Sequence, residues 1–336
     1  MLSKKLHEKI SPQYIIEDII GSGSYGTVFS GKQRQSGRAV AIKVFLTGQK
    51  LSDNCLNEIK LLFRLKHDHI VTALDFFFAS GCYAIVFEFM NEGDLRQLMQ
   101  HGPLEESHVL MIASQIASGL DYIHNKGIIH RDLKPENILI HRNSQEIRYK
   151  ICDFNISRFA ANGNLRATNQ GSPLYMAPEQ FYDNYDYRAD LYALGVILYE
   201  LLCGSPPFEG VYLTLMRAHI QNTPDWHPLE HISEHTQTMI QSLLAKDANQ
   251  RPPNAKALLE NIHTILQKDL PQRPQTPEAS VQSKAPTGPI LTWDAEESSF
   301  YLKYVDSSLW KQCYTVMSLP EPNKIGQLVE KDYLSL

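Results

Sequence analysis

The sequence lacks several features that would assign it to a specialised class of protein. None of its apolar runs reaches about 18 residues, so no membrane-spanning helix is expected. The first ten residues are polar and carry three lysines, so no signal peptide is expected either. The formal net charge is -5, which argues against a nucleic-acid-binding surface because such a surface needs a basic excess. Internal repeats are absent as well.

Cysteine is scarce, and its spacing excludes two further classes. No CxxC pair occurs among the five cysteines, which are Cys55, Cys82, Cys152, Cys203 and Cys313. This scatter favours free thiols in a reducing compartment, and hence a cytoplasmic location, over a disulfide framework or a zinc site. Residues 67–69 read H-D-H, but no second ligand pair accompanies them, so a turn is preferred to a metal site.

What is present is an ordinary globular composition, with 43% hydrophobic and 21% charged residues. Short β-type runs, the first three of them broken by glycines, predict strands at 14–20, 27–31, 39–45, 71–78 and 83–89. Helical periodicity begins at residue 52 and predicts later helices at 95–100, 105–126, 190–202, 211–221, 233–244 and 255–267. The sequence therefore predicts an α+β chain with a small β-rich lobe followed by a larger helical lobe.

Composition changes sharply after the last predicted helix. Residues 268–289 are rich in Pro, Gln, Ser and Thr and poor in apolar side chains, which predicts a disordered linker. Residues 290–336 regain aromatic side chains. We expect this tail either to pack on the helical lobe or to bind a partner.

The most informative segment is 130–137, which reads H-R-D-L-K-P-E-N. It places the carboxylate of Asp132, the ammonium of Lys134 and the amide of Asn137 within six residues. Phosphoryl transfer from ATP to a hydroxyl needs one group to orient the nucleophile, one to neutralise the γ-phosphate and one to hold Mg²⁺. These three side chains supply those groups in a fixed order.

A glycine-rich segment at 21–28 reads G-S-G-S-Y-G-T-V, and glycines let backbone N–H groups approach phosphates. A dinucleotide-binding loop would open a helix, but a β-branched and aromatic run follows here, so the loop is predicted to join two strands. On the next predicted strand Ala41 and Lys43 share a face. There the small Ala41 leaves room for adenine and Lys43 reaches the phosphates, unless Lys43 is only a surface lysine.

Three more segments lie in a fixed order on the C-terminal side. They are D-F-N at 153–155, A-P-E at 177–179 and R-A-D-L-Y-A-L-G at 188–195. Together with the segments above they resemble a eukaryotic-type Ser/Thr protein kinase over roughly residues 14–267. The resemblance implies a two-lobed kinase fold and transfer of the γ-phosphate of MgATP to serine or threonine hydroxyls of protein substrates. Lysine at position 134 is typical of the Ser/Thr-directed members.

The resemblance also implies a division of the chain and a set of site residues. The division is a lead at 1–13, a kinase domain at 14–267 with lobes at 14–90 and 91–267, a linker at 268–289 and a tail at 290–336. The implied catalytic residues are Lys43, its partner Glu58, Asp132, Lys134 and Asn137, with Asn137 and Asp153 as Mg²⁺ ligands. The implied ATP contacts are Ile20, Gly21, Ser22, Gly23, Ser24, Tyr25, Gly26, Thr27, Val28, Ala41, Lys43, Glu88, Met90, Asp94, Leu139 and Asp153.

Several of the implied site residues have an alternative, structural interpretation. The Glu88 carbonyl and the Met90 amide would bond adenine, whereas Asp94 either contacts ribose or caps a helix. Cys152 would lie on the floor of the nucleotide site, where inert packing is preferred to a reactive role. Thr168 would be phosphorylated by an upstream kinase or by the chain itself, unless it is only solvated.

Charged partners follow from the same resemblance. The receivers of a phosphate on Thr168 would be Arg131 and Arg158. Ser172 is expected to bond Asp132 and Lys134. Two buried contacts are also implied: Asp190 would anchor the catalytic-loop backbone, and Glu179 would pair with Arg251. A separate hypothesis is that Glu136, Asp94 and Glu200 favour basic residues upstream of the acceptor.

The main departure from the family pattern is Asn155, which stands where the D-F-G motif has glycine. Asparagine tolerates left-handed torsions better than other side-chain-bearing residues. We therefore expect altered switching and a slower rate, with metal binding retained. Two alternatives remain open: a pseudokinase or scaffold with weak or no catalysis, and a kinase that acts on a small molecule.

Overall fold

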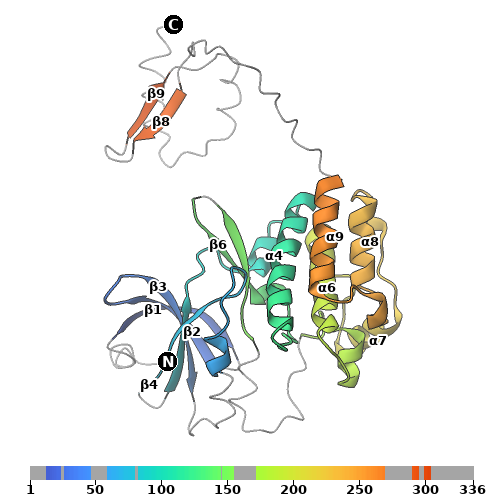
Figure 1. Cartoon of the computed structure of the whole chain (residues 1–336), viewed down its shortest axis with the longest axis horizontal. Coiled ribbons are helices and arrows are strands. Elements are labelled where there is room, and N and C mark those ends of the chain that lie inside the picture. The colour runs from blue at the N-terminus through green and yellow to red at the C-terminus, as the bar shows by residue number, and fades with distance from the viewer. Residues whose placement is uncertain are drawn as a thin grey trace. The chain divides into compact units, whose positions relative to one another are not determined.

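The structure is a computed structural model of the whole chain. It describes residues 13–23, 26–46, 59–79, 82–144, 146–154 and 172–268, and the backbone alone of 290–294 and 299–303. Two compact units are present, Met1–Gln272 and Arg273–Leu336. Figure 1 shows the first unit as a β-rich lobe and a helical lobe, and β8 and β9 in the second.

The β-rich lobe is one antiparallel sheet in the order β1-β2-β3-β5-β4. Its strands are β1 (Tyr14–Gly23), β2 (Gly26–Gln33), β3 (Ala39–Leu46), β4 (Ala73–Ala79) and β5 (Cys82–Glu88). All five were predicted from runs of β-type residues. One face of β3 shows why: Val40, Ile42 and Val44 are buried against Phe29 and Val86, whereas the residues between them are half-buried or exposed.

The predicted helix that begins at residue 52 is described only from Ile59 onward. Residues 59–62 are helical, and Ile59, Leu62 and Leu65 are buried in the main core. The preceding part, which includes Glu58, lies outside the described residues.

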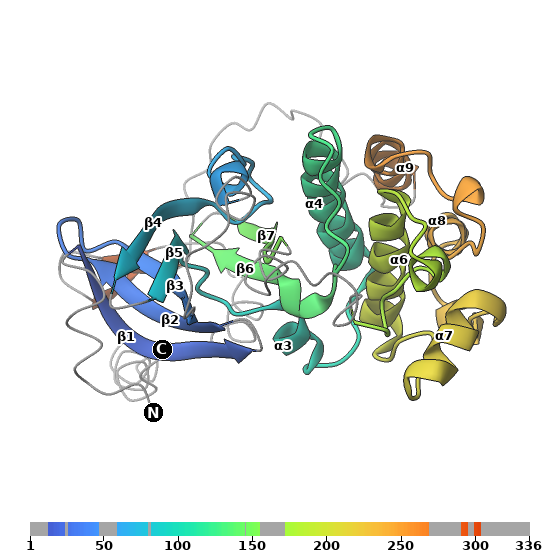
Figure 2. The same ribbon diagram turned by 90° about the horizontal axis from the view of Figure 1, so that it is seen from below.

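The helical lobe contains α3 (Leu95–Met99), α4 (Glu106–His124), α6 (Arg188–Cys203), α7 (Tyr212–Gln221), α8 (Glu234–Leu243) and α9 (Ala255–Lys268). Each begins and ends within two residues of its prediction. Helix α6 is buried over most of its length, and α4 and α8 pack against it (Figure 2). A Cβ on Gly195 would lie 2.7 Å from the Cβ of Leu243, so glycine permits the close approach of α6 and α8.

The sequence did not predict the hairpin of β6 (Ile138–Arg142) and β7 (Ile147–Ile151). It lies between the sheet and α4, as Figure 2 shows. Isolated bridges join Ile70 to Ile151 and Asp94 to Leu139, so this hairpin connects segments from both lobes. Short 3-10 helices η1 (Pro135–Asn137), η2 (Pro178–Tyr182), η3 (His227–Leu229) and η4 (Ala248–Gln250) complete the lobe.

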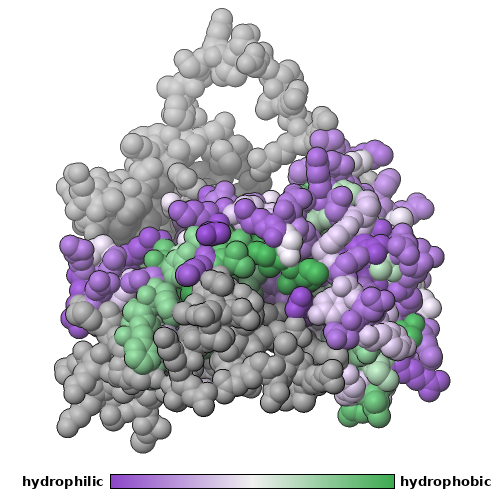
Figure 3. Space-filling model, turned by 60° about the horizontal axis from the view of Figure 1, so that its bottom comes forward, coloured by the Kyte–Doolittle hydropathy of each residue, from purple (hydrophilic) through white to green (hydrophobic). Residues whose placement is uncertain are grey.

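In the second unit β8 (Ile290–Asp294) pairs antiparallel with β9 (Ser299–Lys303). The sequence did not predict this hairpin. In the first unit the visible described surface is mostly hydrophilic, with apolar groups in a few patches (Figure 3). Among the described helices, none is both long and apolar enough to cross a bilayer.

Candidate active site

The glycine-rich loop is a β-hairpin, as the sequence predicted. Gly21 pairs with Val28, so β1 and β2 stay paired close to the tip at residues 24–25, which lie outside the described residues. Gly26 has a φ of 145°, and a Cβ there would lie 2.4 Å from the carbonyl oxygen of Val44. Only glycine fits that position. The hairpin carries the expected ATP contacts Ile20, Gly21, Ser22, Gly23, Gly26, Thr27 and Val28.

Lys43 links the sheet to the helical lobe. Its Nζ lies 2.5 Å from Oδ1 of Asp153, which follows the end of β7. The side chain of Lys43 is 12% exposed and that of Asp153 is 46% exposed, so solvent reaches the pair mainly from the side of Asp153. Ala41 lies on the same face of β3 as Lys43. The expected partner Glu58 lies outside the described residues.

The catalytic loop is held from underneath by Asp190, which is 1% exposed. Its Oδ2 accepts the backbone N–H of His130, its Oδ1 accepts that of Arg131, both at 2.9 Å, and His124 Nε2 lies 2.8 Å from Oδ2. Burial raises the pKa of Asp190, but the bonds from His124 and Arg131 outweigh burial, so the pKa lies below its usual range. The predicted anchor is confirmed. It holds Arg131 at a φ of 71°, which is strained for a non-glycine residue.

Asp132 is oriented by contacts on several sides. Oδ1 accepts the backbone N–H of Ser172 at 2.8 Å, and Oδ2 lies 3.1 Å from Nζ of Lys134. Nδ2 of Asn137 donates to the Asp132 carbonyl oxygen at 2.8 Å. The side chains of Asp132 and Lys134 are 24% and 27% exposed, so a ligand can still reach both. The expected contact between Ser172 and Asp132 is made by the backbone amide.

Asp153 has the left-handed φ of 58°, and its neighbour Phe154 packs edge-on against His130 with the ring centroids 5.3 Å apart. His130 Nε2 also lies 2.8 Å from the carbonyl oxygen of Cys152. The catalytic loop and the segment that carries Asp153 therefore support each other. Asn155 lies outside the described residues.

Cys152 is placed between these two segments. Its backbone N–H donates to the carbonyl oxygen of Asn137 at 2.9 Å, which fixes the spacing between the two expected Mg²⁺ ligands, Asn137 and Asp153. Burial raises the pKa of the Cys152 thiol well above its usual value, and the Asp153 carboxylate adds to this. The thiol stays protonated and unreactive at neutral pH, which supports the packing interpretation.

A buried ion pair fixes the segment that joins the lobes. Nζ of Lys150, on β7, donates to Oε1 of Glu88 at 2.8 Å, and the Thr72 backbone N–H donates to the same oxygen at 2.8 Å. Burial raises the pKa of Glu88, but these two donors lower it more, so the carboxylate stays ionised. Met90 follows, 8% exposed. The contact with Lys150, which spans 62 residues, was not predicted from the sequence.

Asp94 caps α3. Its Oδ1 accepts the backbone N–H of Gln97 at 2.9 Å, and the preceding Gly93 has a φ of 72°. This confirms the helix-cap interpretation. The backbone of Asp94 also bridges to Leu139 on β6, which brings two expected nucleotide contacts together.

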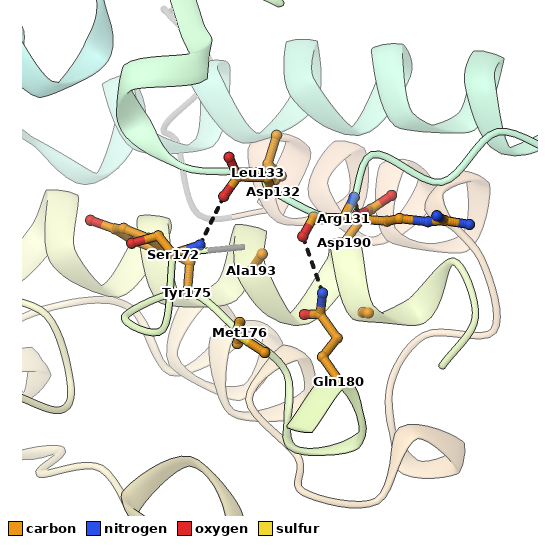
Figure 4. A pocket seen from close by; sticks show the side chains of 10 residues that line it. Arg131, Asp132, Leu133, Ser172, Tyr175, Met176, Gln180, Asp190 and Ala193 are labelled. Atoms are coloured by element: carbon orange, nitrogen blue, oxygen red, sulfur yellow. Dashed lines mark hydrogen bonds between the residues drawn. The ribbon is translucent and has the colours of Figure 1, made fainter. Parts of the chain in front are cut away.

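A narrow crevice lies beside Asp132, between the catalytic loop, the segment that follows Ser172 and α6 (Figure 4). Its lining residues are Arg131, Asp132, Leu133, Ser172, Tyr175, Met176, Gln180, Ala189, Asp190 and Ala193. Gln180 Nε2 donates to the Arg131 carbonyl oxygen at 3.1 Å, and its Oε1 accepts the Ala177 N–H at 2.8 Å. Sequence reasoning missed Gln180, because no motif marked it.

Two of the three arginines expected to have partners lie within the described residues. Arg251 is fully buried and donates to both carboxylate oxygens of Glu179, at 2.6 and 2.8 Å, so that predicted pair is confirmed. The Arg131 guanidinium lies 5.7 Å from the ring centroid of Tyr185. Residues 155–171 lie outside the described residues, and with them Thr168 and Arg158.

This arrangement agrees with a comparison of the sequence with known families. Residues 14–268 match the protein kinase domain. The chain belongs to the protein kinase family.

Its relatives include Ser/Thr kinases from distant organisms. Serine/threonine-protein kinase TIO of Arabidopsis thaliana is 37% identical over 245 residues, which are 71% of this chain and 18% of that protein. Serine/threonine-protein kinase 36 of Mus musculus is 36% identical with the same coverage. A probable myosin light chain kinase of Dictyostelium discoideum is 30% identical, covering 74% of this chain and 73% of that protein. The chain thus spans less than a fifth of the first two relatives.

A solved structure supports the fold independently. The crystal structure of Rad53 1-466 in complex with AMP-PNP shares 31% identity with this kinase at a TM-score of 0.63. The match covers 74% of this chain and 64% of that chain. The predicted two-lobed α+β fold is confirmed.

Proposed function

We propose that this chain is a Ser/Thr protein kinase that transfers the γ-phosphate of ATP to hydroxyl groups of protein substrates. One observation carries the proposal: two oppositely charged pairs are linked to each other through the backbone. Lys43 pairs with Asp153, Lys134 pairs with Asp132, and the backbone contact from Cys152 to Asn137 joins the two. Opposite charges held this way suit a polyphosphate and a hydroxyl nucleophile.

Asp132 is the residue that orients the acceptor and takes its proton. As the acceptor oxygen bonds to the γ-phosphorus, the bond from that phosphorus to the ADP oxygen breaks, and the hydroxyl proton passes to the Asp132 carboxylate. Lys134 stabilises the negative charge on the transferred group. Lys43 neutralises charge on the α- and β-phosphates, a task that requires it to exchange its contact with Asp153 for phosphate oxygens.

The ATP site is bounded by the glycine hairpin and the segment that joins the lobes. The Glu88 carbonyl and the Met90 amide bond adenine, because the ion pair with Lys150 fixes the end of β5. Ala41 and Leu139 enclose the ring from the two lobes. The Asp94 carboxylate, which already caps α3, would also contact the ribose.

The donor set fits Mg²⁺, with Asn137 and Asp153 as protein ligands. Both offer oxygen atoms, and Mg²⁺ in phosphate-transfer sites takes one or two protein ligands and completes its shell with phosphate and water. When bound, the cation would neutralise phosphate charge.

Proteins are the proposed acceptors because Ser172 and the A-P-E segment border Asp132, where a polypeptide would lie. We place this activity in the cytoplasm, since free thiols suit a reducing compartment. Among the described residues, Cys152 and Cys203 form no disulfide. Phosphorylation of Thr168, received by Arg131 and Arg158, is part of the same proposal.

The test is transfer of labelled γ-phosphate from MgATP to mixed protein substrates by the purified chain. We expect label on serine or threonine, and a loss of about a thousandfold in rate for Asp132→Asn. Asn155→Gly should raise the rate severalfold if the altered motif restrains switching. The folded state of each variant is checked by thermal unfolding.

Two outcomes would contradict the proposal. Label only on small molecules would assign a different acceptor class. No transfer by the wild type or by Asn155→Gly, even after an upstream kinase has acted on Thr168, would favour a scaffold.

A further inference from the structure

Arg96, on α3, is bound between two carboxylates that lie far from it in the sequence. Its Nε donates to Oε1 of Glu136 at 2.9 Å, and its Nη1 donates to Oε1 of Glu200 at 2.6 Å. Nη2 contacts the hydroxyl of Tyr175, which in turn donates to Oε2 of Glu200 at 2.6 Å. Both oxygens of Glu200 therefore have donors from within the chain.

This cluster borders the place where an acceptor peptide would lie. Glu136 is in η1, four residues after Asp132, and α3 contacts η1. Tyr175 follows Ser172 by three residues, and its backbone N–H donates to the Ser172 carbonyl oxygen at 2.9 Å. Ser172 in turn holds Asp132 (Figure 4). A peptide whose hydroxyl reaches Asp132 therefore passes close to these glutamates.

Arg96 and Tyr175 keep their protonation states within this cluster. The side chain of Glu200 is 6% exposed, whereas those of Arg96 and Glu136 are 30% and 43% exposed. Burial alone lowers the pKa of Arg96, but the bonds from Glu200 and Glu136 outweigh it, so the guanidinium stays charged. Burial and then Glu200 raise the pKa of Tyr175, so its hydroxyl keeps the proton that it donates.

We propose that Arg96 determines acceptor specificity: it occupies, from within the chain, the acidic pair Glu136 and Glu200 that would otherwise bind a basic residue of the substrate. The inference rests on the proposed protein kinase function. It replaces the hypothesis from the sequence that Glu136, Asp94 and Glu200 attract basic residues, because all three have partners in the chain. The enzyme accepts substrates without a basic residue at the position that reaches this pair.

The experiment compares Ser-containing peptides that carry either Arg or Gln at each of several positions flanking the serine. For the wild type we expect kcat/KM ratios of Arg to Gln peptides within about threefold at every position. Arg96→Met leaves the two carboxylates without their internal cation, and the ratio should then rise about tenfold at one position, since a charge-assisted contact is worth about that factor.

Matched variants separate specificity from folding. Arg142→Met removes another partly exposed arginine, one that pairs with Glu92, and should leave every ratio unchanged. Arg96→Met with Glu200→Met replaces the buried pair by apolar groups and should return the ratio toward that of the wild type. If Arg96→Met does not fold, Arg96→Gln keeps donors without the charge and carries the same expectation.

Two results would overturn the inference. One is a tenfold preference of the wild type for Arg that Glu200→Gln removes, because Arg96 would then yield to substrate. The other is a folded Arg96→Met variant with unchanged ratios at all positions. Absence of transfer to any peptide by the wild type would instead contradict the proposed function.

Discussion

The charged side chains in and around the catalytic loop form two groups, and the two groups differ in what neutralises their charges. Beneath the loop, Asp190 is 1% exposed and is bonded to two backbone N–H groups and to His124. By contrast, the pairs of Lys43 with Asp153 and of Lys134 with Asp132 are partly exposed. The buried group uses partners fixed by the fold, whereas the exposed groups neutralise one another.

The two groups therefore have different roles. A buried carboxylate that loses its partners cannot turn to water, so its bonds are permanent and they determine backbone conformation. Ion pairs at a partly exposed site contribute little to stability and can be exchanged for a ligand of the same charge. Substitutions beneath the loop should therefore change stability and activity together. Substitutions in the partly exposed pairs should change activity alone.

The largest effect is expected beneath the loop, for Asp190→Asn. An amide supplies one acceptor but turns an NH₂ group toward a backbone N–H of His130 or Arg131, which leaves buried donors facing each other. We expect a loss of about 3–5 kcal/mol in the free energy of unfolding, measured by urea titration, together with a large fall in rate.

Asp68→Asn is the matched control, because that carboxylate is 75% exposed and, among the described residues, pairs with Arg148 across the surface. Its stability should change by less than about 0.5 kcal/mol. A full loss of activity in Asp190→Asn without loss of stability would erase the distinction drawn between the two groups.

A smaller effect, confined to activity, is expected in the partly exposed pairs, for Lys43→Met. Phosphate oxygens lose a cation there, so kcat/KM should fall about a hundredfold while the free energy of unfolding changes by less than about 1 kcal/mol. Steady-state kinetics and urea titration measure the two quantities on the same preparation.

Lys32→Met gives the control on the neighbouring strand, where the lysine pairs with Glu17 at the surface. It should leave both quantities unchanged. Equal rates for Lys43→Met and the wild type would show that Lys43 does not contact the nucleotide.

Sequence reasoning found the local features of this fold. Helix α4, predicted over 105–126 and observed over Glu106–His124, has a regular apolar period, and such a signal needs no knowledge of neighbours. The contacts of Asp190 with the catalytic loop and of Glu179 with Arg251 were also predicted, because motifs at fixed positions identify both partners.

What remained hidden depends on distant pairs without a motif. Arg96 meets Glu136 and Glu200 across 40 and 104 residues, and no periodicity relates those positions. The hairpin of β6 and β7 was missed because β7 buries three consecutive residues, one of them a lysine, and so shows no apolar alternation. Long-range polar contacts of this kind can be identified only once the fold is known.

A second buried histidine in the helical lobe extends the comparison to pH. His124 bonds a carboxylate, whereas His219, which is fully buried, has the hydroxyl of Tyr192 at 2.9 Å as its partner. Burial lowers the pKa of His219 to about 4, and the ammonium of Lys246 adds to this. A buried histidine without a carboxylate therefore resists protonation.

This gives the smallest of the expected effects, a loss of stability in acid. In the unfolded chain His219 titrates near 6.5, so as the pH falls the unfolded state binds the proton first and stability declines toward the folded value of about 4. Between pH 7 and pH 5 the loss is roughly 2 kcal/mol. His219→Gln should flatten this slope in urea titrations, whereas His231→Gln, at an exposed site, should not. An unchanged slope in His219→Gln would place the acid sensitivity elsewhere.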